Sequence, residues 1–135
     1  MNYKTVLTTC PYCGCGCGMY LEVLDGEVIG VLPSVGHPIN QGSLCIKGWS
    51  AHEFISSGKR LTRPLMRWDG DLVEVSWDEA LERTAAELKR IRDESGPDSL
   101  AVLTSAKCTN EENYLLMKFT RAVLGTNNID HCARL

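Results

Sequence analysis

The chain has 135 residues and a net charge of −3, with 44% hydrophobic and 23% charged residues. This length suits one domain, or a small module joined to part of another, and the composition is ordinary for a globular protein. The acidic charge and the lack of a basic run argue against nucleic-acid binding and membrane-surface binding, and no apolar stretch is long enough to span a membrane.

The first third of the sequence predicts short strands joined by turns. Residues 4–8 are rich in β-prone side chains and lead into a glycine-rich loop that holds four cysteines. Two apolar runs, residues 19–24 and 27–32, flank Asp25 and Gly26. Because both of those residues tolerate positive φ, the segment predicts a β-hairpin.

A change of organisation is expected near the middle of the chain. Cys45 is predicted to open a short helix that continues to Phe54, and residues 56–60 have the composition of a connector. We therefore predict a metal-binding module at residues 1–60 and an incomplete α/β domain at residues 61–135.

The second half of the sequence begins with another predicted hairpin. Apolar runs at residues 65–68 and 72–75 flank the turn sequence at residues 69–71, Asp-Gly-Asp. Ser76 is then expected to cap a helix, and Glu79, three residues later, completes a capping box.

Two helices with one buried face each are expected in this half. The first ends at Gly96, and the second opens at a capping box on Thr109 and ends at Gly125. A short strand at residues 99–104 separates them, and another strand begins before the end of the chain. The positions predicted to be buried are Ala80, Leu81, Thr84, Ala85, Leu88 and Ile91 in the first helix and Leu116, Phe119, Thr120 and Val123 in the second. Alternating strands and helices predict an α/β fold, α+β in part, with a parallel sheet.

Seven cysteines are the unusual feature of the composition. Reducing compartments do not favour structural disulfides, so crowded thiols predict metal binding or redox chemistry. The pattern C-x2-C-x3-C-x27-C is formed by Cys10, Cys13, Cys17 and Cys45. Three thiolates in a tight loop plus one distant thiolate are a common way to hold a [4Fe–4S] cluster, and the loop glycines let the backbone wrap around it.

Zinc is the alternative for four thiolates. Zinc sites usually draw on two close pairs, and Cys45 has no cysteine or histidine within three residues. Spacing alone leaves open whether Cys15 or Cys17 is the third ligand. The histidines have no partner at ligand spacing and are expected in loops or at the surface; they are His37, His52 and His131.

Three motifs in order resemble those of the molybdenum and tungsten bis-pyranopterin oxidoreductases. Residues 10–17, CPYCGCGC, are similar to the family's C-P-Y-C-x3-C opening, and residues 40–48, NQGSLCIKG, to its N-x-G-x-L-C-x-K-G segment. Residues 75–81, VSWDEAL, resemble the start of a family helix. The resemblance covers the whole chain and implies the [4Fe–4S] module and α/β domain of that fold.

The resemblance also implies roles for single residues. The implied cluster ligands are Cys10, Cys13, Cys17 and Cys45, with Cys15 as a bystander. Lys47 is similar to the family's lysine that lies between cluster and pterin. The resemblance implies two roles for Lys47: a catalytic role as an electron relay, and a contact with the pterin. Lys107 is a second candidate for a cofactor contact. The family often has arginine there, and lysine loses bidentate pairing.

The C-terminal stretch narrows the resemblance to formate dehydrogenases. Residues 110–114 and 125–135 are similar to that group, whereas nitrate reductases of this fold usually have asparagine where Cys132 stands. This implies oxidation of formate to carbon dioxide at a molybdenum or tungsten bis-molybdopterin guanine dinucleotide. Electrons would pass to an iron–sulfur or flavin subunit. Another enzyme of the superfamily, such as a nitrate reductase, and a standalone iron–sulfur electron carrier are the alternatives.

The end of the sequence suggests a further hypothesis. In formate dehydrogenases the metal ligand, a selenocysteine or cysteine, would be the residue after Leu135. We therefore expect an N-terminal part of a catalytic subunit, truncated where UGA is read as stop and inactive without the remainder of the subunit. Arg134 is expected to position the metal ligand or to form a salt bridge. The first nine residues carry neither a long apolar run nor a twin-arginine pair, so a cytoplasmic location is expected.

Overall fold

The computed structural model describes residues 1–132, which form two compact units. The first unit comprises Met1–Arg60 and Ser105–Asn113, and the second comprises Leu61–Thr104 and Tyr114–Cys132. Among the described residues, no helix combines the length and hydropathy that a membrane crossing needs. The role expected of Arg134 lies outside the described residues.

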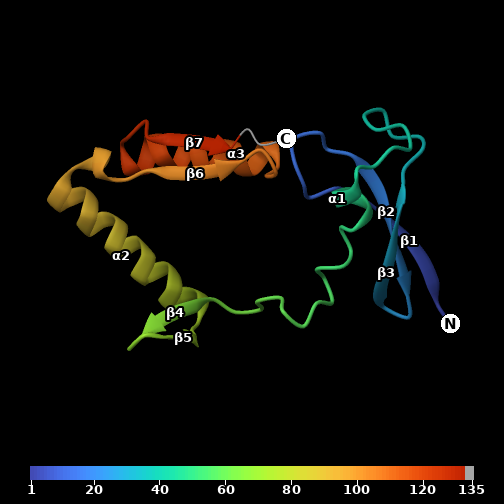
Figure 1. Ribbon diagram of the computed structural model, residues 1–135, viewed down its shortest axis with the longest axis horizontal. Helices are drawn as coiled ribbons and strands as arrows, with labels where there is room; N and C mark the ends of the chain where they lie inside the picture. The colour runs from blue at the N-terminus through green and yellow to red at the C-terminus, as the bar shows by residue number, and fades with distance from the viewer. Residues whose placement is uncertain (133–135) are drawn as a thin grey trace. The chain divides into compact units, whose positions relative to one another are not determined.

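An antiparallel sheet of three strands forms the body of the first unit (Figure 1). The strands β1 (Tyr3–Thr9), β2 (Gly18–Leu24) and β3 (Glu27–Pro33) pair in the order β1-β2-β3. Asp25 and Gly26 turn between β2 and β3 with φ of 48° and 95°. Both lie in the left-handed region, as a two-residue hairpin turn requires, so the predicted hairpin is confirmed.

A small hydrophobic core lies at the cysteine end of this sheet. Met19 and Val31 from the strands pack there with Cys10 and Ala51, and all four are buried. Partly buried neighbours of this core are Tyr12, Cys17, Leu21 and Leu44. The loop that carries the predicted metal ligands is therefore anchored in apolar packing at its first cysteine.

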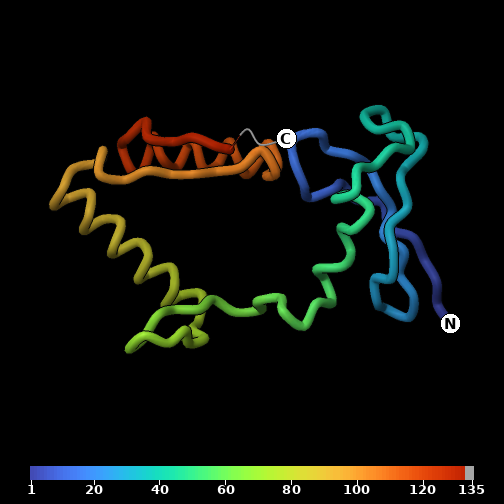
Figure 2. The backbone as a smooth tube through the Cα atoms, in the orientation of Figure 1, coloured from blue at the N-terminus to red at the C-terminus, as the bar shows by residue number. Residues whose placement is uncertain are grey.

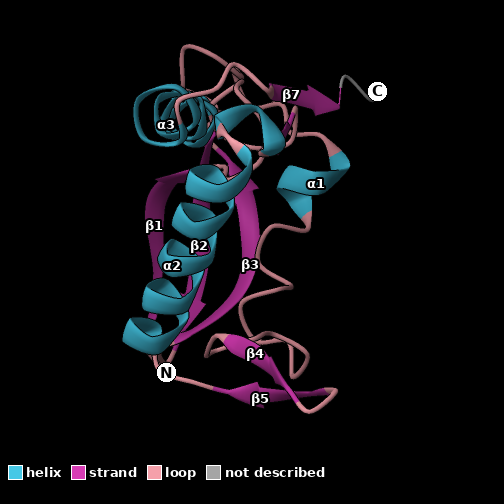
Figure 3. Ribbon diagram, turned by 90° about the vertical axis from the view of Figure 1, so that its left-hand side faces the viewer, coloured by secondary structure: helices cyan, strands magenta, loops and turns pink. Residues whose placement is uncertain are grey.

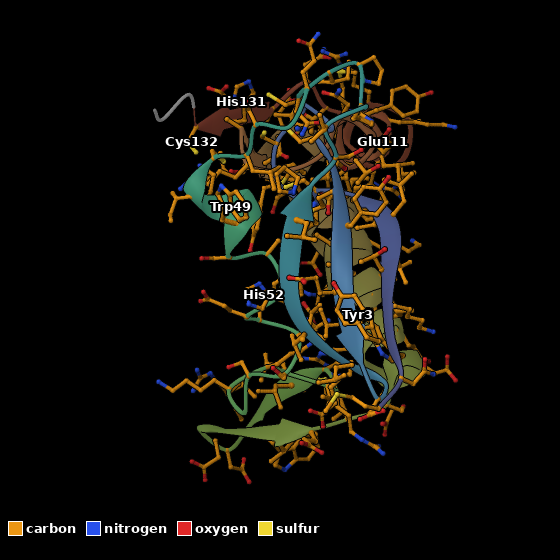
Figure 4. The ribbon with its side chains drawn as sticks, turned by 90° about the vertical axis from the view of Figure 1, so that its right-hand side faces the viewer. Tyr3, Trp49, His52, Glu111, His131 and Cys132 are labelled. Carbon is orange, nitrogen blue, oxygen red and sulfur yellow. The ribbon has the colours of Figure 1, made fainter. Side chains whose placement is uncertain are left out.

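The helix α1 (Ile46–Trp49) begins directly after Cys45, as predicted, but it is shorter than predicted. Helix formation is cooperative and marginal in short segments without packing, and Gly48 is the buried residue of α1. Trp49, labelled in Figure 4, is 43% exposed. Hydrogen-bonded turns follow up to Ile55, and Figure 2 shows irregular backbone from there towards the second unit.

The second unit opens with a short antiparallel hairpin. It pairs β4 (Leu65–Trp68) with β5 (Asp71–Glu74), and Leu65 lies opposite Glu74. Asp69 and Gly70 take φ of 47° and 97°, which is again the turn geometry that the sequence predicts.

The longest helix, α2 (Trp77–Ser95), follows this hairpin and runs without a break in Figure 3. The Glu79 N–H donates to the Ser76 hydroxyl at 3.2 Å, and the Ser76 N–H donates to the Glu79 carboxylate at 2.9 Å. This reciprocal pair is the predicted capping box. Gly96, with φ of 83°, ends the helix as predicted.

Strands and a helix alternate in the rest of the described chain. The short 3-10 turn η1 (Pro97–Ser99) precedes β6 (Val102–Ser105), so the strand begins later than predicted. The helix α3 (Asn110–Phe119) and β7 (Ile129–Cys132) follow, and β6 pairs with β7. In Figure 1 the arrows of these two strands point the same way. The predicted α/β class, with a parallel pair, is confirmed.

The predicted buried faces of the two helices are only partly correct. No residue of α2 is buried, and Leu81 is 59% exposed, because η1 and the short η2 (Thr120–Leu124) are the elements that pack most against α2. In η2, Thr120 is fully buried as predicted, but Val123 is 53% exposed and Leu124, at 4%, takes the core position. The segment is a π-helical turn, so its side chains leave the 3.6-residue register on which the prediction was based.

Candidate metal centre

The cysteine loop, residues 10–17, connects β1 to β2 within the first unit. The Cys10 N–H donates to the Cys17 carbonyl at 2.8 Å and closes the loop at its base. Cys13 and Gly16 take positive φ of 50° and 66°. Glycine adopts this region without steric cost, whereas Cys13 occupies it at some strain, so the loop backbone is bent tightly around its thiols.

Thiols from the loop and from Cys45 lie close enough to influence one another's ionisation. Cys10 is buried, Cys13 and Cys17 are half-buried, and Cys45 is exposed. Burial, followed by the charges of the other three thiols, raises the pKa of Cys17. Because neighbouring thiolates repel one another, holding them all ionised requires a cationic centre, and the irons of a cluster supply one.

The pKa of Cys45 is shifted in the opposite direction to that of Cys17. A hydrogen bond from the Gly48 backbone lowers the pKa of Cys45, burial opposes this shift, and the backbone and charge of Lys47 lower the pKa further. The thiolate is the form that binds metal, so the first residues of α1 favour the metal-binding form of Cys45.

Cys15 differs from the other thiols of the loop because it is exposed. A hydrogen bond with the Cys13 side chain raises the pKa of Cys15, and the charges of Cys13, Cys17 and Cys45 raise it further. The environment of Cys15 thus favours its protonated form, whereas that of Cys45 shifts the pKa in the opposite direction.

Segments distant in the sequence also contact the cysteine loop. The Cys13 N–H donates to the Lys107 carbonyl at 3.2 Å, and the Asn110 amide donates to the Gly14 carbonyl at 3.1 Å. The structure therefore brings Lys107 to the loop through its backbone, while its side chain is exposed. The motifs in the sequence gave no indication of these contacts.

Gly18, the first residue after the cysteine loop, is held by a turn that contains His37 and Asn40. Asn40 belongs to the second sequence motif, but the motif does not explain this contact. The buried Gly18 donates its N–H to the Asn40 side chain at 2.8 Å and, at 3.3 Å, to Nδ1 of His37. His37, expected in a loop or at the surface, is half-buried on this turn. Asn40 lies only five residues before Cys45 in the second motif. This short spacing is the sequence signal that could have predicted its contact with Gly18 of the glycine-rich segment.

Two hollows are lined in part by residues of the cysteine loop within the first unit. The smaller, about 90 Å³, is lined on one side by the cysteine loop and on the other by the start of α3, with residues Thr9, Cys10, Cys13, Gly14, Gly16, Thr109, Asn110 and Glu111. The larger, about 630 Å³, lies in the size range of small-molecule sites. Tyr12 of the loop and Lys47 of α1 both line it, and the charge of Lys47 also acts on Cys45.

The larger hollow is predominantly cationic. Lys47, Lys59 and Arg60 line it together with one carboxylate, that of Glu53. The Arg60 guanidinium lies 4.9 Å from the centre of the Phe54 ring, within cation–π range. The side chain of Lys107 is not among the residues that line this hollow.

The donor set fits an iron–sulfur cluster. Among residues 1–132, no three cysteine, histidine, aspartate or glutamate side chains are gathered for a single metal ion. A mononuclear zinc site draws every thiolate to about 2.3 Å from one ion. A cubane instead distributes its thiolates over separate irons, which is consistent with a tight three-thiol loop and one ionisable thiol on another segment.

Family models match nearly the whole chain. Residues 3–57 match the molybdopterin oxidoreductase Fe4S4 domain, and residues 60–135 match the molybdopterin oxidoreductase model. These two matches support a [4Fe–4S] cluster and a molybdenum or tungsten molybdopterin as the cofactors of the full enzyme.

Curated relatives and a solved structure agree with these matches. The F420-dependent formate dehydrogenase subunit alpha of Methanocaldococcus jannaschii is 53% identical over the whole chain, which covers 19% of that protein. A putative formate dehydrogenase of Staphylococcus haemolyticus is 47% identical over 97% of the chain and 13% of its own length. The chain thus spans about a fifth or less of these relatives. Acetylene hydratase from Pelobacter acetylenicus matches with a TM-score of 0.72 at 27% identity, over 93% of this chain and 18% of that one.

Proposed function

Because the chain belongs to the molybdopterin oxidoreductase family, we propose that it is part of a formate dehydrogenase catalytic subunit and holds the [4Fe–4S] cluster of that enzyme. The family resemblance, the oxidoreductase class and the two cofactors predicted from the sequence are confirmed by the family matches. Formate as the substrate is supported by the names of the relatives, several of which are formate dehydrogenases.

One observation supports the proposed ligand assignment: the closed, partly buried loop and Cys45, whose pKa is lowered, belong to the same compact unit. The proposed ligands are Cys10, Cys13, Cys17 and Cys45. Cys15 is the bystander, because it is the exposed thiol of the loop and it is engaged with the side chain of Cys13.

Lys47 is the proposed electron relay. It lies two residues after Cys45 and lines the hollow of about 630 Å³ that Tyr12 of the cysteine loop also lines. When bound, the metal–pterin group supplies the two-electron chemistry that converts formate to carbon dioxide. The positive charge of Lys47 favours the more negative, reduced state of any centre beside it. A contact between Lys107 and the cofactor stays a proposal, supported only by the position of its backbone beside Cys13.

The proposed partners are formate, the remainder of the catalytic subunit and an electron-accepting iron–sulfur or flavin subunit. The designation of the relatives as alpha subunits supports an enzyme of several subunits. The cytoplasmic location predicted from the sequence stays a prediction.

Anaerobic reconstitution with iron and sulfide tests the proposal. We expect about four irons per chain and an EPR signal of a [4Fe–4S]⁺ cluster after reduction with dithionite. Cys10→Ala and Cys45→Ala should abolish the signal, and Cys15→Ala, the matched control from the same loop, should keep it. Stoichiometric zinc binding without any cluster would contradict the proposed function.

A further inference from the structure

Asn40 joins the two parts of the proposed ligand set. Its side-chain oxygen accepts the Gly18 N–H at 2.8 Å, and its amide donates to the carbonyls of Gly18 and Ser43 at 3.1 and 3.0 Å. Gly18 directly follows Cys17, and Ser43 lies two residues before Cys45. One side chain therefore ties the backbone beside the third thiol to the backbone beside the fourth.

The chemistry of this contact is specific to an amide side chain. Asparagine presents an acceptor and two donors, which match the N–H of Gly18 and the two carbonyls. Aspartate has the same shape but at neutral pH presents acceptors only, so it faces both carbonyls with negative charge. Gly18 is buried, so without Asn40 its N–H keeps only the 3.3 Å bond to His37 and its carbonyl keeps only the 3.1 Å bond from the Ser34 N–H, with little water to replace the lost partner; Ser43 is exposed.

Asn110 makes a related contact in the middle of the cysteine loop, at Gly14. Its amide donates to the Gly14 carbonyl across 96 positions of sequence, at 3.1 Å. A methyl group on Gly14 would overlap the Asn110 side chain, so the two residues are in close contact. The Cys13 N–H donates to the Lys107 carbonyl, so Lys107 and the first residue of α3 hold the loop at two successive residues, Cys13 and Gly14.

We propose that Asn40 and Asn110 are positioning residues that hold the cysteine loop in the geometry the cluster requires. Their side chains bond backbone groups next to the ligands, so they act through the ligands and not on iron. The inference rests on the proposed function, since it needs a cluster at these cysteines. It extends that function because it makes residues outside 1–60 part of the cluster site.

The test compares variants of the 135-residue chain after anaerobic reconstitution. The variants are Asn40→Ala, Asn40→Asp and Asn110→Ala, with Ser43→Ala as the local control, because Ser43 meets Asn40 through its carbonyl and not its side chain. The measurements are iron per chain, the rate of iron loss to a chelator, the EPR line shape and the melting temperature of the iron-free chain.

We expect Asn40→Ala and Asn40→Asp to lose iron about 10 to 100 times faster than the wild type, as is typical when a partner of a metal ligand is removed. Asn110→Ala should show a smaller acceleration, since it removes a single exposed bond. The EPR line should change in each Asn40 variant, whereas Ser43→Ala should match the wild type.

The outcomes separate the inference from the proposed function. If the wild type assembles a cluster and the Asn40 variants hold iron as tightly with an unchanged EPR line, the positioning role is wrong and the ligand assignment stands. A wild-type chain that binds no cluster overturns both. If Asn40→Ala and Asn40→Asp lower the melting temperature of the iron-free chain and leave iron retention unchanged, Asn40 supports the fold alone and the inference fails.

Discussion

Gly18 and His37 lie in such close contact that the Gly18 N–H donates to Nδ1 of His37 and a methyl group on Gly18 would overlap the imidazole ring. Gly18→Ala should therefore force His37 or the loop exit to move. We expect a loss of about 1 to 3 kcal/mol in the free energy of unfolding, the usual cost of overpacking. Urea denaturation followed by circular dichroism measures it.

Gly36→Ala is the matched control for this substitution. Gly36 has negative or extended φ and no atoms near the position of an added Cβ, so alanine should be tolerated there. Equal unfolding midpoints for the two variants would show that the contact between Gly18 and His37 is loose in solution.

Leu124 carries much of the apolar packing of the π-helical turn. It is 4% exposed and lies beside the fully buried Thr120. Leu124→Ala should lower the free energy of unfolding by about 2 to 5 kcal/mol, because the cavity it leaves cannot fully collapse. Val123→Ala, one residue earlier and 53% exposed, should change it by less than about 0.5 kcal/mol. Thermal melting of the two variants makes the comparison, and similar melting temperatures would argue against the assigned core.

The capping box predicts how α2 responds to acid. Hydrogen bonds from the Ser76 hydroxyl and backbone hold the pKa of Glu79 below its ordinary value of 4.5. Because the folded-state pKa is depressed, the stabilisation is fully present above the ordinary pKa and is lost as pH falls through the folded-state pKa. The helical signal of α2 should therefore weaken only in that acidic range.

The variant Glu79→Gln separates the effect of protonating the Glu79 carboxyl from the effect of the hydrogen bonds of the capping box. Glutamine keeps an acceptor for the Ser76 N–H and has no proton to gain, so the variant should lose less helical signal between neutral pH and pH 3 than the wild type. An acid titration by far-ultraviolet circular dichroism decides the matter; identical curves would exclude Glu79 as the source of the acid response.

Substitution of Thr126 is expected to lower the free energy of unfolding because it removes a hydrogen bond. It is 4% exposed, and its hydroxyl donates to the Asp98 carboxylate at 2.6 Å. Thr126→Val keeps the shape but leaves that carboxylate without this donor, at a cost of about 1 to 3 kcal/mol. Thr5→Val, on the exposed strand β1, is the control and should be nearly neutral in chemical denaturation. A neutral Thr126→Val would indicate that water replaces the lost donor.

Local patterns predicted the parts of the fold that neighbouring residues determine. The turn at Asp25 and Gly26 depends on two residues that accept positive φ, and the cap of α2 on a serine with a glutamate three positions later. Such features require no knowledge of the rest of the chain, which is why they agree with the structure.

The remaining features depend on contacts that no local pattern contains. The face of α2 around Leu81 has helical spacing, yet its burial requires a neighbouring layer, and the described residues cover it only in part. The roles of Asn40 and Asn110 depend on which distant glycine each one meets. Spacing indicated a metal site at the cysteines and the family resemblance selected Cys17 over Cys15, but neither could identify the residues proposed to position the ligands.

The offset of 96 positions between Gly14 and Asn110 has a consequence for synthesis of the protein. Translation proceeds at about 5 to 20 residues per second, so the cysteine loop is made about 5 to 20 seconds before the segment that holds its middle. Iron delivered during that interval would meet a loop still without that contact. Cluster insertion after Asn110 has left the ribosome would instead meet the complete set of contacts.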